Sequence, residues 1–102
     1  MADDLIENIR AIYNQTVEGK ISWQKQSPTL FIAFVKQKAQ LVIQRAGASY
    51  VFRVINMPGN QEVINVSSSY KPELEIILRG LFNAADKNVD STGARFLGDL
   101  LG

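Results

Sequence analysis

Apolar residues recur at helical spacing near the amino terminus, which predicts an amphipathic helix over residues 4–18. The apolar face of this helix holds Leu5, Ile9 and Ile12. Asp4 and Glu7 have the spacing of a capping box, which favours a helix start at this point. Gly19 is placed to end the helix, because glycine readily adopts the left-handed conformation of a C-cap.

The middle of the chain consists of short apolar or alternating runs separated by turn signals, which is typical of β-strands. The predicted strands are Ile21–Lys25, Thr29–Lys36, Gln40–Arg45, Tyr50–Asn56 and Glu62–Val66. The connections between them are too short for crossover helices, so the strands should form an antiparallel meander. The run Thr29–Lys36 is almost continuously apolar, which predicts that both of its faces are at least partly covered.

Two turns are predicted from their residues. Lys36-Gln37-Lys38 separates two apolar runs and indicates a hairpin turn. Met57-Pro58-Gly59-Asn60 is a stronger signal, because proline fixes φ and the following glycine accepts a positive φ. Within Tyr50–Asn56, alternation predicts that Phe52 and Arg53 lie on opposite faces of the sheet.

The last third of the chain returns to helical periodicity. Pro72 fits the first turn of a second helix. Its apolar stripe is Leu74, Ile77, Leu78, Leu81, Phe82 and Ala85. Asn88 is expected to end this helix, and Asp90 to cap a short third helix that carries Ala94, Leu97, Leu100 and Leu101. The predicted fold is a single α+β domain over residues 1–102. It has an N-terminal helix, an antiparallel meander of four to five strands, and two C-terminal helices packed on the sheet.

The composition bears on the binding partner and on the cellular compartment. Eleven Lys and Arg face ten Asp and Glu, so a protein that binds nucleic acid would need a local basic patch. Cysteine is absent, which favours a reducing compartment for so small a domain. The acidic start of the chain differs from a signal peptide, and the longest apolar run, Leu30–Val35, is too short to span a bilayer. We expect a cytoplasmic protein.

Histidine is also absent, and this limits the available chemistry. Without imidazole or thiol groups the chain can form neither a Ser-His-Asp nor a Cys-His arrangement, and it lacks the usual ligands for transition metals. Asp86, Asp90 and Asp99 do not follow the calcium-loop pattern, so no metal site is predicted. We therefore expect no cofactor and name no catalytic residue, and a binding function is favoured over an enzymatic one.

Two groups of residues in the predicted sheet are candidates for binding. Trp23 could anchor a partner, or it could cover the first helix and the sheet as a core residue. Four basic residues could hold a phosphate, with nearby aromatic rings for stacking, or could simply solvate the sheet. The basic residues are Lys36, Lys38, Arg45 and Arg53, and the aromatic residues are Phe31, Phe34 and Tyr50.

The predicted third helix is the other candidate. Gly93 and Gly98 each cost about 1 kcal/mol relative to alanine, so a helix this short needs a surface on which to dock. That surface could belong to the same domain or to a second subunit, and the latter arrangement would give a two-fold dimer. The residues expected to make the contact are Phe96, Leu97, Leu100 and Leu101.

The order of elements resembles a group of small bacterial and phage domains of unknown function. The similarity is carried by Leu5–Val17, Ile21-Ser22-Trp23, Tyr50–Val54, Leu78–Ala85 and Val89–Leu101. The resemblance implies a bacterial setting and the fold described above, and it assigns no catalytic residue. The sequence thus favours a non-catalytic, self-associating protein–protein interaction module. The alternative is a small nucleotide- or nucleic-acid-binding domain that uses the basic side of the sheet.

Overall fold

The computed structural model describes the backbone of residues 2–57 and 59–101, and the side chains of the same residues apart from 2–4 and 91–96. The chain begins with the helix α1 (Ala2–Val17), which confirms the predicted first helix. Gly19 follows with a φ of 80°, a conformation that glycine adopts without strain. The amide of Gly19 donates to the carbonyl of Thr16 at 3.1 Å and closes the last turn.

Five strands then form one antiparallel sheet, in which each strand pairs with the next in the sequence. The strands are β1 (Trp23–Ser27), β2 (Leu30–Val35), β3 (Ala39–Ala46), β4 (Ser49–Asn56) and β5 (Gln61–Ser67). This order confirms the predicted meander. At the β2–β3 hairpin, Lys36 and Gln37 have φ of 54° and 58°, as a type I′ turn requires. The β4–β5 connection also lies where a turn was predicted, although Pro58 is outside the described residues.

Residue pairing across the strands separates the sheet into two faces. One row pairs Trp23 with Ala33, Ala33 with Leu41, and Leu41 with Val54. A parallel row on the same face is Phe31, Ile43, Phe52 and Val66. Most of these side chains are buried, so this inner face forms the core side of the sheet. Phe52 lies on it and Arg53 on the outer face, as the alternation of β4 predicts.

The C-terminal part is helical. A short 3-10 helix, η1 (Pro72–Leu74), leads directly into the long helix α2 (Glu75–Leu101). Pro72 occupies the first turn, as predicted, where the amide hydrogen that proline lacks is not needed. The sheet-facing stripe of α2 is fully buried at Leu78, Leu81 and Ala85, and Leu74 of η1 is buried next to it. The α+β class and the placement of the C-terminal helical part on the sheet are thus confirmed.

The break predicted between Asn88 and Asp90 is absent, because α2 continues through both residues. Asn88 is buried, and its side chain hydrogen-bonds to α1 and β1 instead of capping the helix. With no proline nearby, an internal asparagine costs a helix less than about 1 kcal/mol, which its tertiary hydrogen bonds offset. The predicted second and third helices are therefore one continuous helix.

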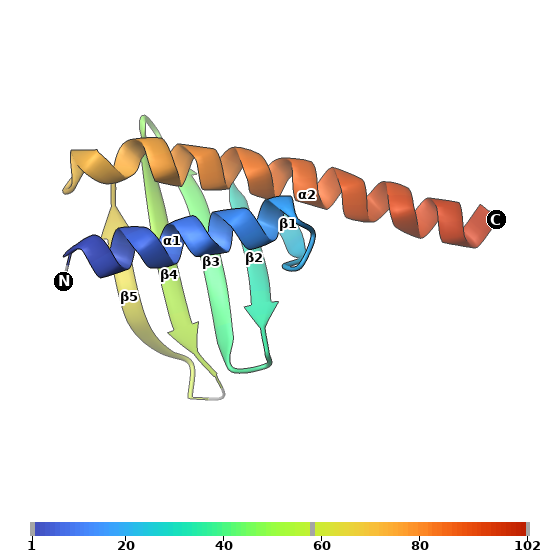
Figure 1. Cartoon of the computed structure of the whole chain (residues 1–102), viewed down its shortest axis with the longest axis horizontal. Helices are drawn as coiled ribbons and strands as arrows, with labels where there is room; N and C mark the ends of the chain where they lie inside the picture. The colour runs from blue at the N-terminus through green and yellow to red at the C-terminus, as the bar shows by residue number, and fades with distance from the viewer. Residues whose placement is uncertain (1, 58, 102) are drawn as a thin grey trace.

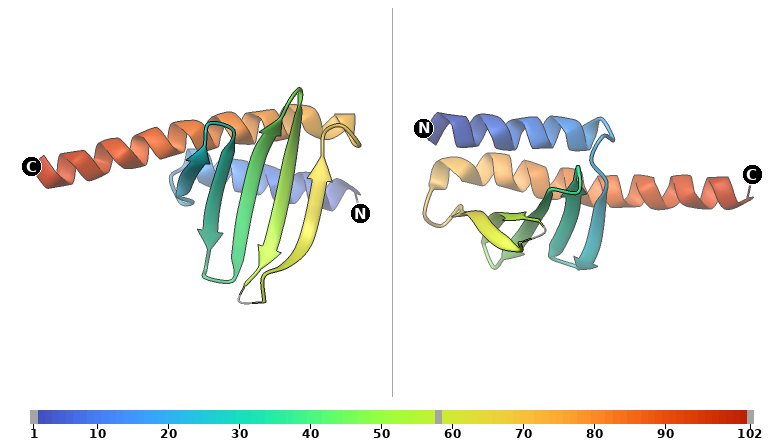
Figure 2. Two further views of the ribbon diagram at one scale, coloured as in Figure 1. Left: turned by 180° about the vertical axis from the view of Figure 1, so that it is seen from behind. Right: turned by 90° about the horizontal axis from the view of Figure 1, so that it is seen from below.

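Both helices lie on the inner side of the sheet (Figure 2). The helix α2 contacts the strands, and α1 packs mainly against α2 (Figure 1). The ring of Tyr13 lies against Gly80, where an added Cβ would be 3.7 Å from Cε2 of the ring. No described helix covers the outer face of the sheet. The partial covering of both faces that was predicted for β2 is therefore not provided by a second layer of helices.

Candidate functional site: the exposed surface of α2

The C-terminal part of α2 projects past the edge strand β1 into solvent (Figure 1). We call residues 90–101 the α2 overhang. Leu97, Leu100 and Leu101 are 58%, 65% and 87% exposed. Leucine side chains with this exposure leave apolar surface in water that burial would remove at a gain of roughly 25 cal/mol per Å². The side chain of Phe96, predicted to take part in the same contact, lies outside the described residues.

Asn88 fixes the direction in which the overhang leaves the domain. Its Nδ2 donates to the carbonyl oxygens of Thr16 at 3.1 Å and Ile21 at 2.8 Å. Its Oδ1 accepts from the backbone amide of Trp23 at 2.9 Å. One side chain therefore joins the end of α1, the start of β1 and α2, immediately before the overhang begins. No local pattern indicates this role, because the partners of Asn88 lie 65 to 72 residues away in the chain.

Trp23 belongs to the same network. It is 2% exposed, and its Nε1 donates to Oγ1 of Thr16 at 2.9 Å. Thr16 in turn donates to the carbonyl of Ile12 at 2.8 Å. This placement agrees with the core role considered for Trp23, since the indole is enclosed by α1, α2 and the sheet and presents no surface to a partner.

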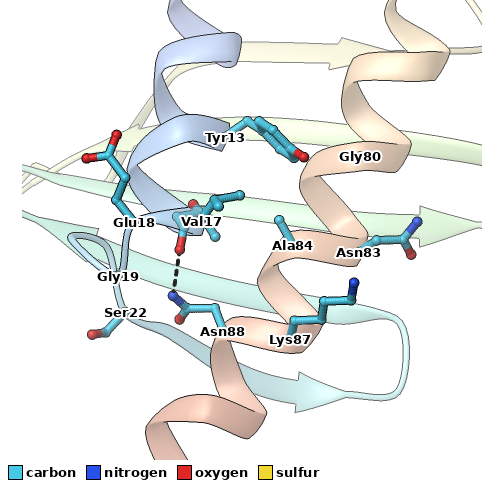
Figure 3. Close-up of a pocket in the computed structure, with 11 residues that line it drawn as sticks. Tyr13, Val17, Glu18, Gly19, Ser22, Gly80, Asn83, Ala84, Lys87 and Asn88 are labelled. Atoms are coloured by element: carbon cyan, nitrogen blue, oxygen red, sulfur yellow. Dashed lines mark hydrogen bonds between the residues drawn. The ribbon is translucent and has the colours of Figure 1, made fainter.

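A groove runs between α1 and α2 on the side away from the sheet (Figure 3). It contains two adjoining cavities of about 480 and 450 Å³, and Tyr13 and Gly80 line both. Figure 3 shows Tyr13 reaching from α1 toward α2 at Gly80, with Asn83 and Lys87 on the α2 side. Gly80 and Ala84 form a low α2 wall, against which the ring of Tyr13 lies at Gly80, and the two cavities lie on either side of this contact.

The four basic residues predicted to hold a phosphate do not come together. Lys36 and Lys38 lie in the β2–β3 hairpin, whereas Arg45 lies near the opposite end of β3. The guanidinium carbon of Arg45 is 5.9 Å from the centre of the Phe82 ring, on the inner face. Arg53 is on the outer face, where it forms a 3.1 Å ion pair with Glu62. These positions occupy both faces and both ends of the sheet.

The aromatic residues proposed for base stacking are also dispersed. Phe31 is fully buried and stacks edge-on against Phe82, with ring centres 5.1 Å apart. Tyr50 packs against the same ring on the core side. Phe34 is half exposed on the outer face, next to Gln40 in the pairing. A row of stacking platforms along a basic groove is therefore not formed by these residues.

The outer face of the sheet is a second uncovered surface. Leu30, Ile32, Val51 and Ile55 are partly exposed there, among glutamine side chains and the Arg53–Glu62 pair. Nε of Arg53 is buried without a hydrogen-bond partner, so this pair is incompletely satisfied. The mixture of apolar and polar residues gives this face no clear chemical preference.

Chemistry at either surface is limited by the residues present. Among the described side chains, no three acidic groups lie close enough to hold a metal ion. Asp86 and Asp90 are exposed on α2, on successive turns. Within the described residues there is also no helix with the length and apolar character needed to cross a membrane.

Comparison with known proteins returned no match: no family model, no curated protein and no solved structure is similar to this chain.

Proposed function

We propose that this protein is a non-catalytic protein–protein interaction module of the bacterial or phage cytoplasm, and that it self-associates through α2. The observation that carries the proposal is the α2 overhang, with Leu97, Leu100 and Leu101 exposed beyond the domain edge. The missing histidine and cysteine support a binding role over a catalytic one. The lack of cysteine also supports a reducing compartment.

The overhang has a physical reason to bind something. Residues 90–101 lie in the helix α2, and Gly93 and Gly98 each weaken that helix by about 1 kcal/mol. Such a segment is marginal as an isolated helix in water. Docking its leucines on another surface would stabilise the helix and remove apolar area from solvent at the same time.

The basic sheet is a weaker basis for function. Lys36 and Lys38 are separated from Arg45 by the length of β3, and Arg53 is engaged with Glu62. Phosphate binding needs several cations directed at one point, and this arrangement offers isolated charges. The observations therefore favour protein binding over nucleic-acid binding.

Backbone amide exchange tests the proposal at the segment in question. In dilute solution, amides of residues 90–101 should exchange rapidly, because this part of the helix projects past the sheet and contains two glycines. At high protein concentration they should become protected, while the amides of β3 and β4 stay unchanged. The double variant Leu97→Glu/Leu101→Glu should abolish the concentration dependence, whereas Val63→Glu, at a position on β5 about as exposed as Leu97, should preserve it.

Exchange in residues 90–101 that is identical at all concentrations, together with a monomeric mass at high concentration, would refute self-association. Protection that appears only when another protein is added would also refute self-association and leave the interaction module with a different partner.

A further inference from the structure

We infer that two copies of the chain pair through the solvent-facing side of α2, antiparallel, about a two-fold axis that passes between Lys87 and Asp90. This inference rests on the proposed self-association and adds its geometry. It starts from a regular spacing on α2, where residues 76, 80, 83, 87, 90, 94, 97 and 101 follow one another at alternating steps of four and three residues, and we call these positions the α2 seam. Six of them are exposed, Gly80 is half-buried, and the side chain of residue 94 lies outside the described residues.

A spacing of four and three residues is that of a left-handed coiled-coil contact. Apart from Gly80, which packs against Tyr13 of α1, the described seam residues lie outside the sheet-facing stripe, which uses other residues, such as Leu78 and Ala85. Ile76 is 74% exposed at one end of the seam, and Leu97 and Leu101 are exposed at the other. A helix seam that keeps its apolar ends in water is a candidate for pairing with another helix.

The order of residues along the seam selects the second copy as the occupant. Both ends of the seam are apolar and its centre is charged. When two such helices run antiparallel, Ile76 lies opposite Leu101 of the second copy, and Lys87 lies opposite Asp90. A two-fold axis repeats both contacts, so four apolar and four charged residues are matched at once.

Charge also fixes direction and register. A parallel pair would place Lys87 against Lys87 and Asp90 against Asp90. An antiparallel pair shifted by one step of the seam would place either Asp90 against Asp90 or Lys87 against Lys87 across the axis. Like charges that face each other in an interface destabilise the wrong arrangements, so one register is favoured.

The α1–α2 groove provides an independent reason for this placement. Its two cavities are lined by Ile76, Gly80, Asn83 and Lys87, which form the N-terminal half of the seam. In the proposed register Leu97 of the second copy faces Gly80 and the ring of Tyr13 that lies against it, between the two cavities. The C-terminal half of each seam, on the α2 overhang, thus lies along the α1–α2 groove of the other copy. Val17 of α1, itself exposed, lines the same groove and would add apolar contact.

Disulfide trapping tests the geometry, and the absence of native cysteine makes the result easy to interpret. Ile76→Cys and Leu101→Cys alter exposed positions, so both variants should fold. An equimolar mixture should form a heterodimeric disulfide as the main oxidised product. Each variant alone should not, because identical cysteines would be about 38 Å apart at a rise of 1.5 Å per residue. Val63→Cys mixed with either variant is the matched control and should remain reduced.

A charge exchange tests the register. Lys87→Glu should weaken dimerisation about tenfold or more, since it faces Asp90 of the second copy twice, and Lys87→Glu/Asp90→Lys should restore the wild-type constant. A disulfide formed by Ile76→Cys alone would indicate a parallel pair and overturn the inference. A wild-type dimer by light scattering without the mixed disulfide would overturn the geometry and leave the proposed function intact. A wild-type monomer at all concentrations would overturn both.

Discussion

Replacing Asn88 by alanine should lower the free energy of unfolding by about 2–4 kcal/mol. Three backbone groups depend on this side chain: the amide of Trp23 and the carbonyls of Thr16 and Ile21. The amide of Trp23 and the carbonyl of Ile21 would lose this partner in a largely buried site, at about 1–3 kcal/mol per group, whereas the carbonyl of Thr16 would still accept from the amide of Gly19. Two effects reduce the total. Asn88 lines the 480 Å³ cavity, so water can reach part of the site, and alanine is the better helix former by roughly 0.7 kcal/mol.

Urea unfolding followed by tryptophan fluorescence suits this test, because Trp23 is the only tryptophan and belongs to the network. The matched control is Asn83→Ala, the same substitution at an exposed position of the same helix, which should change stability by less than about 0.5 kcal/mol. The protein should be dilute enough to be monomeric, and the m-value should not change. A loss below about 1 kcal/mol for Asn88→Ala would show that the three hydrogen bonds do not hold the elements together.

Three further predictions concern the core and the absent chemistry. Leu78→Ala should cost about 2–5 kcal/mol in denaturant unfolding, because Leu78 is fully buried against the sheet, whereas the exposed Leu100→Ala should cost less than about 0.5 kcal/mol. Elemental analysis of untagged protein should find no stoichiometric zinc or iron, and one ion per chain would contradict the reading of the composition. A salt titration with an oligonucleotide should show no steep dependence of binding on salt, and a steep slope would support the nucleic-acid alternative.

The sheet could be predicted because the pattern of apolar and polar residues along each strand matches the burial of its side chains in the structure. Alternation in Tyr50–Asn56 predicts that Phe52 and Arg53 lie on opposite faces, and the structure places Phe52 in the core and Arg53 on the outer face. The Lys36–Lys38 segment predicted a hairpin from its polarity alone, and its type I′ geometry follows from the short connection between two paired strands. Burial on one face enforces the register, since a shift by one residue would turn every core side chain toward solvent.

The C-terminal helix shows where local signals fail. Asn88 and Asp90 carry residue types that favour helix ends, yet their preference is weak compared with tertiary hydrogen bonds. Nothing near Asn88 in the sequence indicates that its partners are Thr16, Ile21 and Trp23. Because the helix is continuous, it carries the exposed leucines past the edge of the sheet. The residues of the candidate surface could therefore be predicted, whereas their position on one long helix could not.

Burial of Trp23 was similarly open at the level of sequence. Its strand is short and at the sheet edge, which suits either an exposed anchor or a core residue. The outcome depends on Thr16, seven residues earlier on another element, which accepts the indole hydrogen bond. Whether the basic residues come together also depends on the assembled sheet. Arg45 and Arg53 lie on opposite faces of it, so they cannot contact the same ligand.

Sedimentation equilibrium of the full chain and of a chain ending at Val89 is the most direct test of the claim that α2 beyond the sheet is an association surface. The shortened chain keeps Asn88 and every residue of α2 that is buried among those the structure describes, so it should fold and remain monomeric from low to high micromolar concentration. The full chain should pass from monomer to dimer over the same range. A full chain that stays monomeric throughout, or a shortened chain that dimerises equally well, would contradict the account.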